Sequence, residues 1–267
     1  MKILVCVKQV PDTTEIKIDP VTNTLIRDGV PSIVNTFDAY ALELAVLLKE
    51  KYGGTVTVCS MGPAQAVKAL RKCLSVGADE AVLVSDRAFG GSDTLATSYV
   101  LSSAIKTLEG KSQERFDLIF CGKQAIDGDT AQVGPEIAEH KGLPQVTYVT
   151  EVSELRENSV VVKKESDEGY DLIEVPKPCV LSVTKTAFEP RYGTIRGVRR
   201  AHRTAIEMLT AADMDIDTKK IGLKGSPTKV KRSFTPAQKK AGIILKEETA
   251  SAAASKLITL LEQAAVL

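Results

Sequence analysis

The sequence lacks any apolar run long enough to cross a membrane. Of its 267 residues, 43% are hydrophobic and 26% charged, which is usual for a globular protein with a sizeable core. No uninterrupted apolar stretch approaches the roughly 20 residues that a transmembrane helix needs. The first ten residues, MKILVCVKQV, contain no small-residue cleavage site and are expected to form a strand instead of a signal peptide.

Cysteine is scarce, and its spacing argues against disulfide bonds. The five cysteines are odd in number and never form a CxxC pair. Cys6, Cys59 and Cys121 lie in apolar runs, where cysteine behaves as a small hydrophobic residue. Neither disulfides nor a zinc site is expected, and a reducing, cytoplasmic location suits the chain.

Aromatic residues make up only 4% of the chain, which bears on its uneven charge. Residues 185–246 contain 15 Lys/Arg against 5 Asp/Glu, or +10, while the remainder contains 20 against 29, or −9. A nucleic-acid interface would interleave stacking aromatic residues with such charge. This segment offers only Phe188, Tyr192 and Phe234, so nucleic acid is not the expected partner. A docking arm for a protein surface and a solvated tail both remain open.

The first 145 residues alternate between apolar, strand-like runs and amphipathic, helix-like stretches. Such alternation predicts a doubly wound, mostly parallel sheet with helices on both faces. Ligands of such sheets bind at the carboxyl ends of the strands, near the point where the strand order reverses. Strands are expected over residues 3–10, 55–61, 81–85 and 116–121, a hairpin over 15–27, and helices from Asn35-Thr36, near Pro63, from Ser92 or Asp93, and over 130–141.

The pattern changes after residue 145. Strand-like runs over 145–151, 159–164, 170–175 and 179–183, with little helix between them, predict an antiparallel extension of the same domain. Residues 226–232 are expected to be extended, and 250–267 to form an alanine-rich helix with an apolar stripe. We therefore expect a nucleotide-binding α/β domain over 1–184, a basic arm over 185–246 and a C-terminal helix over 247–267.

The stretch CGKQAIDGDTAQVG, residues 121–134, has several possible functions. A calcium loop starting at Asp127 would need a ligand, a glycine and a glutamate at its fifth, sixth and twelfth positions. Those positions hold Ala131, Gln132 and Ala138, so no metal site is expected. A catalytic acid pair would need a third group to set its roles, and the nearest histidine is His140 on the next helix.

The same stretch follows a buried strand and opens a helix, so its backbone amides gather at a helix N-terminus, where phosphates bind. Two glycines allow close approach of the backbone, and the polar side chains can contact a ribose or cap the helix. A nucleotide mono- or diphosphate fits, while an ordinary polar β–α loop stays open. The residues concerned are Gly122, Lys123, Asp127, Gly128, Asp129, Thr130 and Gln132.

Four other loops would meet this stretch at the same rim of the sheet. Each follows a strand or opens a helix, which individually is a weak signal, but together they favour a single nucleotide site. They are residues 6–9, 35–38, 61–63 and 90–94.

Short blocks in the sequence resemble the beta subunit of electron transfer flavoproteins, and the resemblance covers nearly the whole chain. The blocks are VKQVPD at residues 7–12, GKQAID at 122–127, EVP at 174–176 and EPRY at 189–192. The resemblance implies an adenine-nucleotide alpha-hydrolase-like fold holding either AMP, as in the classical branch, or a second FAD, as in the electron-bifurcating branch. The implied cofactor-binding positions are Cys6, Asn35, Thr36, Phe37, Asp38, Met61, Gly122, Lys123, Gln124, Ala125, Ile126, Asp127, Gly128, Asp129, Thr130, Ala131, Gln132 and Val133.

Two stretches resemble the bifurcating branch: VPDT at residues 10–13 and DRAFGGSDTLAT at 86–97. The second, if not merely a surface turn, would supply amides for the second phosphate of FAD. Its implied FAD-binding residues are Gly91, Ser92, Asp93, Thr94 and Thr97. Arg87 and Gly90 would interact with NADH, and a contact of Arg87 with the reduced flavin is the alternative.

The resemblance also implies partners and a reaction. In a heterodimer with an alpha subunit, NADH would give a hydride to the beta-subunit flavin. One electron would pass to the alpha-subunit FAD and an acyl-CoA dehydrogenase-type partner, the other to ferredoxin or flavodoxin. Tyr192 and Ile195 would lie in a partner-recognition loop, and the basic arm and last helix would wrap the alpha subunit. A classical carrier with structural AMP and a stand-alone nucleotide sensor are the alternatives.

Overall fold

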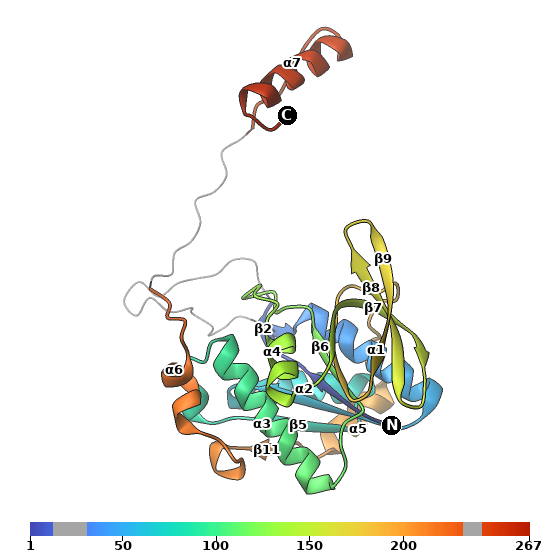
Figure 1. Cartoon of the computed structure of the whole chain (residues 1–267), viewed down its shortest axis with the longest axis vertical. Coiled ribbons are helices and arrows are strands. Elements are labelled where there is room, and N and C mark those ends of the chain that lie inside the picture. The colour runs from blue at the N-terminus through green and yellow to red at the C-terminus, as the bar shows by residue number, and fades with distance from the viewer. Residues whose placement is uncertain (13–30, 232–241) are drawn as a thin grey trace.

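The computed structural model describes residues 1–12, 31–231 and 242–267. Within them, a nine-stranded sheet has the order β11-β5-β4-β1-β6-β10-β7-β8-β9 (Figure 1). Every pair from β11 to β7 is parallel, while β8 and β9 are antiparallel to their neighbours. The strands are β1 (Lys2–Cys6), β4 (Thr55–Met61), β5 (Glu80–Val84), β6 (Leu118–Gly122), β7 (Gln145–Leu155), β8 (Ser159–Ser166), β9 (Gly169–Pro176), β10 (Cys179–Val183) and β11 (Glu207–Leu209).

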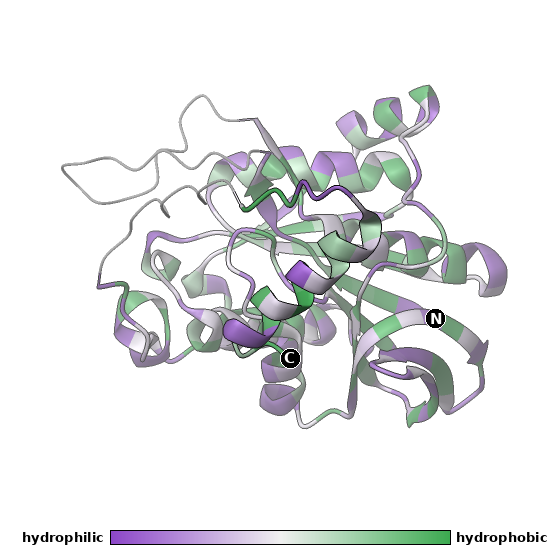
Figure 2. Cartoon of the chain, turned by 90° about the horizontal axis from the view of Figure 1, so that it is seen from above, coloured by the Kyte–Doolittle hydropathy of each residue, from purple (hydrophilic) through white to green (hydrophobic). Residues whose placement is uncertain are grey.

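Helices cover both faces of the sheet, as predicted. Alternate residues of β1 point to opposite sides: Ile3 and Val5 join the cluster containing α1 (Thr36–Tyr52) and α2 (Val67–Val76). Leu4 and Cys6 join the cluster containing α3 (Thr94–Ser112) and α4 (Val133–Lys141). A central strand with helices on both sides must be apolar throughout, which is why the alternation could be read from the sequence. Hydrophobic and hydrophilic segments both occur along the helices (Figure 2).

The run predicted as one strand over residues 3–10 is two strands. β1 ends at Cys6, and β2 (Gln9–Pro11) pairs with β3 (Ser32–Val34) in a separate antiparallel sheet. The break falls at Lys8, whose amide donates to the carboxylate of Asp38 at 2.7 Å instead of continuing the ladder. The predicted hairpin over 15–27, like Thr13, lies outside the described residues.

The antiparallel extension is smaller than predicted. β10 inserts between β6 and β7 and pairs in parallel with both, so two of the four late strands belong to the parallel sheet. Within this sheet, only the pairings β7–β8 and β8–β9 are antiparallel. Strand direction depends on the pairing partner, and β10 pairs with β6, a strand far from it in sequence.

The sheet domain extends beyond residue 184, where the sequence placed its boundary. β11 pairs with β5, and α5 (Ile195–Arg203) packs on α2. Ala201, Leu209 and Ile221 are buried, but such isolated apolar residues give no periodic signal. The remaining short elements are η1 (Ala64–Ala66), η2 (Arg87–Phe89), η3 (Ala211–Asp213), η4 (Thr218–Lys220) and α6 (Gly222–Gly225).

The last helix, α7 (Ala250–Gln263), has no buried residue and lies apart from the sheet in Figure 1. It is slightly shorter than the predicted 250–267, as α4 is shorter than the predicted 130–141. Among the described residues, no helix is long and apolar enough to cross a membrane.

Candidate functional site

The predicted loops meet at the carboxyl edge of the sheet, where the strand order reverses around β1. The chain builds outward through β4 and β5 on one side of β1 and then crosses to β6 on the other. This is where ligands bind in open α/β sheets. Cys6, Met61 and Gly122 are the last residues of β1, β4 and β6.

Asp38, in the first turn of α1, ties two of these strand ends together. Its Oδ2 accepts from the amide of Lys8 at 2.7 Å, and its Oδ1 accepts from the amide of Gly122 at 3.1 Å. Burial raises the pKa of the Asp38 carboxyl to about 7, against the lowering effect of these hydrogen bonds. Both oxygens are engaged by the backbone, so Asp38 positions the loops that follow β1 and β6.

Gly122 is needed for packing against Asp38. A Cβ at this position would lie 2.3 Å from Asp38 Oδ1, so the close backbone approach predicted for a phosphate is made to a protein side chain. Gly128 differs, because a Cβ there would meet no described residue within 4 Å. Within the described parts of the chain, the space beside Gly128 is open.

Asn35 is fully buried and fastens the loop after β6. Its Nδ2 donates to the carbonyl of Gln124 at 2.8 Å, and its Oδ1 accepts from the amide of Ile126 at 3.0 Å. Asn35 is the N-cap residue of α1, but its side chain makes no capping hydrogen bond, contrary to the expected cap. Because Asn35 holds the backbone from Gln124 to Ile126, it sets the conformation of the predicted phosphate loop.

The two aspartates of the loop are paired with side chains. Asp127 Oδ1 lies 2.7 Å from Lys8 Nζ, and Asp129 Oδ1 accepts from Gln124 Nε2 at 2.7 Å. Neither caps α4, whose N-cap residue is Gln132 with no side-chain capping bond. Among the described residues, the start of α4 therefore has no side-chain cap.

The backbone between Asp129 and Val133 has the geometry of an anion-binding loop. Asp129 and Ala131 have φ angles of 52° and 54°, in the left-handed region. Alternation of this kind turns successive amides toward one point, a "nest" that binds anions. Among the described residues, the amides of Thr130, Ala131, Gln132 and Val133 donate to no acceptor. These amides satisfy the chemistry that a phosphate group requires.

The start of α3 lies beside this loop. Thr94 Oγ1 lies 3.1 Å from Glu136 Oε1 and 3.4 Å from Gln132 Oε1, so the N-termini of α3 and α4 are adjacent. The amides of Thr94 and Leu95 donate to no acceptor within the described parts of the chain. Two sets of free amides thus lie close together, as a ligand with two phosphates would need. Thr97 is one turn further along α3 and donates its amide to the carbonyl of Asp93.

The remaining predicted site residues surround these loops. Lys123 Nζ lies 5.8 Å from the centre of the Phe37 ring and 4.8 Å from that of Tyr148. Arg87 is exposed and makes no ion pair with any described residue, and Gly90 follows it at the end of η2. Thr36 opens α1, and Ala125 accepts from the amides of Gly128 and Asp129, which closes the turn.

Three buried thiols lie side by side near the carboxyl ends of the central strands. Cys59, Cys6 and Cys121 lie in register on adjacent strands β4, β1 and β6. Burial raises the pKa of Cys59 well above its ordinary value, and the pKa of Cys121 is raised mainly by its hydrogen bond with Cys6 and then by burial. All five cysteines are free, and they act as packing residues, not nucleophiles.

A second exposed feature is the segment that leads into α5. Tyr192 and Ile195 are 89% and 91% exposed, although the chain beside them is firmly held. Arg191 pairs with the buried Glu43 at 2.8 Å and with Glu50, both on α1. The role of Glu43 could not be predicted from the sequence, because a single glutamate among the apolar residues of a helix does not reveal its partner.

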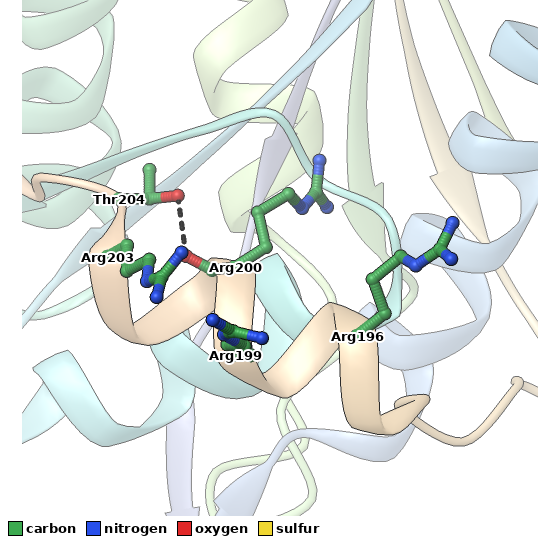
Figure 3. A pocket seen from close by; sticks show the side chains of 5 residues that line it. All are labelled: Arg196, Arg199, Arg200, Arg203 and Thr204. Atoms are coloured by element: carbon green, nitrogen blue, oxygen red, sulfur yellow. Dashed lines mark hydrogen bonds between the residues drawn. The ribbon is translucent and has the colours of Figure 1, made fainter.

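The arginines of α5 line an open pocket of about 450 Å³ (Figure 3). Arg200 donates to the carbonyls of Leu74 and Ala78, which fixes α5 to the end of α2. The lining residues are Arg196, Arg199, Arg200, Arg203 and Thr204.

Together the fold and the candidate site define an α/β protein with a doubly wound sheet, whose predicted loops meet at the switch point. The family model "Electron transfer flavoprotein domain" matches residues 22–214, and the chain belongs to this family. It is 51% identical to electron transfer flavoprotein subunit beta of Clostridium acetobutylicum, over 98% of this chain and 99% of that one. The resemblance to the beta subunit is thereby confirmed.

Two other relatives cover nearly the same length. The caffeyl-CoA reductase-Etf complex subunit CarD of Acetobacterium woodii is 46% identical over 98% of both chains. Protein FixA of Azotobacter vinelandii is also 46% identical, over 97% of this chain and 95% of its own.

Proposed function

We propose that this chain binds FAD at the carboxyl edge of its sheet and takes electrons from NADH as part of a heterodimeric electron transfer flavoprotein. The observation that carries the proposal is the contact between Thr94 Oγ1 and Glu136 Oε1 at 3.1 Å. It places the N-terminus of α3, with its free amides, next to that of α4. AMP has one phosphate and needs one set of amides, whereas FAD has two phosphates.

The chain's own residues would bind and orient the dinucleotide. The amides of Thr130 to Val133 would hold one phosphate and those at the start of α3 the other. Lys123 and the open space at Gly128 lie on the same loop. A flavin bound here supplies the redox chemistry, accepting a hydride and releasing electrons one at a time.

Arg87 is assigned to NADH. It is exposed beside the loop that precedes α3, and no described carboxylate neutralises it. A free guanidinium binds phosphate oxygens through its fork of N–H donors. Gly90, three residues further on, would leave room for the incoming nucleotide.

The proposed partners follow from the family and from the names of the relatives. A protein named subunit beta implies an alpha subunit, and the name of the Acetobacterium relative places it in a complex with a CoA-ester reductase. We therefore propose an alpha subunit that carries its own FAD, an acyl-CoA dehydrogenase-type acceptor docking at Tyr192 and Ile195, and ferredoxin or flavodoxin as the second acceptor. The basic arm and α7 would bind the alpha subunit. The five free thiols suit the cytoplasm.

One observation favours the alternative of a classical carrier with structural AMP. Glu136 lies in the first turn of α4, and its Oε2 is buried without a partner among the described residues. A carboxylate so close to the start of α3 would repel a second phosphate unless it accepts a hydrogen bond from the ligand.

Titration of the purified heterodimer with NADH, followed by flavin absorbance, tests the proposal. We expect NADH to reduce flavin in the heterodimer without any added dehydrogenase. Flavin that stays oxidised in excess NADH would favour the AMP-containing carrier.

A further inference from the structure

We propose that residues 221–228 belong to the framework of the FAD site, and that Asp93 is a positioning residue through which this segment sets the start of α3. The inference rests on the proposed function for the identity of the ligand. It reassigns Asp93 and Ser92, which the sequence offered as direct ligands of the cofactor.

Asp93 is the residue at which the two segments meet. Its Oδ1 accepts from the amide of Ala96 at 3.1 Å and so caps α3. Its Oδ2 accepts from the amide of Thr228 at 3.0 Å, and its own amide donates to Ser226 Oγ at 2.9 Å. Both carboxylate oxygens and the amide are therefore engaged within the chain.

Ser92 makes a parallel connection. Its Oγ donates to the carbonyl of Phe89 at 2.8 Å and accepts from the amide of Gly222 at 3.1 Å. Ser226 is buried, and its hydroxyl donates to the carbonyl of Gly222 at 2.7 Å, which closes the network. Two serines and one aspartate thus fasten residues 222–228 to the loop before α3.

Close packing shows that the two segments fit one another. A Cβ on Gly91 would lie 2.6 Å from the side chain of Leu223, and one on Gly222 would lie 2.3 Å from the carbonyl oxygen of Ala88. Both glycines also have positive φ angles, 75° and 58°. Side chains at either position would separate the segments, so this contact depends on glycine at both.

The two proposed phosphate-binding regions are therefore held by different residues. The loop after β6 is held from below by Asn35 and Asp38, without any help from residues 221–228. The start of α3 is held by Asp93 and its partners in that segment. Loosening the segment should therefore disturb the binding of a second phosphate but not of the first.

The test compares FAD and AMP binding in the full-length chain with its partner subunit, after the beta site has been emptied by dialysis. Thr228→Pro removes the amide that donates to Asp93, and Ser226→Ala removes the hydroxyl that accepts from it. The control, Ser112→Ala, removes an exposed hydroxyl at the end of α3. Thr228→Pro and Ser226→Ala should each weaken FAD binding about tenfold, with AMP binding within about twofold of the unmodified chain.

Equal loss of FAD and AMP affinity, or loss of neither, would overturn the positioning role. Hydrogen exchange of the amides of residues 86–96, measured without ligand, provides a second readout. We expect it to be faster in Thr228→Pro and in Ser226→Ala than in the control. Unchanged exchange would also overturn the inference. If the unmodified chain binds FAD no better than AMP, the proposed function fails, and the exchange rates alone decide whether the segment positions α3.

Discussion

The carboxylate of Asp38 accepts a hydrogen bond from the amide of Gly122 at 3.1 Å, across 84 residues of sequence. This bond joins the first turn of α1 to the end of β6 and fixes where the proposed phosphate-binding loop begins. The two glycines of that loop therefore differ: Gly122 is required for packing against Asp38, whereas Gly128 lies next to open space within the described parts of the chain.

Gly122→Ala should destabilise the protein, whereas Gly128→Ala should not. The first Cβ would overlap Asp38 Oδ1 at 2.3 Å, and the second meets nothing within 4 Å. We expect Gly122→Ala to lower the free energy of unfolding by about 2 kcal/mol and Gly128→Ala by less than about 0.5 kcal/mol. Denaturant unfolding of ligand-free protein measures both, and equal losses would mean that the contact with Asp38 is not limiting.

The buried Asp38 should make stability depend on pH. Its pKa is about 7 in the folded chain and 3.8 in the unfolded reference, so between these values the folded state binds more protons. The contribution of this group to stability therefore falls as pH rises from about 4 to 7, by on the order of 4 kcal/mol at most.

Asp38→Asn removes this titration. The unfolding free energy of the parent minus that of the variant should decrease as pH rises from 5 to 8, because only the parent loses stability from this group. Urea unfolding at several pH values checks it. A difference that does not change with pH would show that Asp38 keeps one protonation state throughout.

Arg191 should position the exposed residues Tyr192 and Ile195. Its fork of donors contacts Glu43 and Glu50, and lysine cannot reproduce this geometry. Arg191→Lys should weaken docking of the dehydrogenase-type partner by about tenfold, because the segment that carries Tyr192 and Ile195 is no longer held firmly on α1. The nucleotide content should stay the same.

Arg156→Lys is the matched control, since Arg156 also pairs with two glutamates but lies in the β7–β9 region. Surface plasmon resonance with the partner dehydrogenase measures both variants. The same loss of affinity in both would indicate a general charge effect.

Arg87→Gln should slow flavin reduction by NADH about tenfold or more, since one charge-assisted contact to a phosphate is lost. FAD affinity should change little, because the phosphate-facing groups are backbone amides. Stopped-flow absorbance gives the rate of reduction, and fluorescence gives the FAD affinity. An unchanged rate would remove the assignment of Arg87 to NADH.

The sequence predicted the class of fold because the central strands are apolar on both faces and the helices between them are amphipathic. It did not predict the direction of β10 or the strand β11, because short strands acquire their direction and partner from pairing with strands that are distant in sequence. Likewise, the loops of the site were found from strand ends and glycines, which are local signals.

The roles of individual polar residues could not be found in this way. Asn35 reaches the amide of Ile126 across 91 residues and Asp93 reaches Thr228 across 135. A polar residue at a strand end looks the same in sequence whether it holds a ligand or a neighbouring loop. Only the contacts show that Asn35, Asp38 and Asp93 hold the backbone, whose amides then face the proposed ligand.

We propose that this chain holds a dinucleotide at the adjacent N-termini of α3 and α4. The nucleotides released on denaturing the purified heterodimer, identified by mass and quantified by absorbance, test it most directly. We expect two FAD per heterodimer and no AMP. One FAD together with one AMP would contradict it.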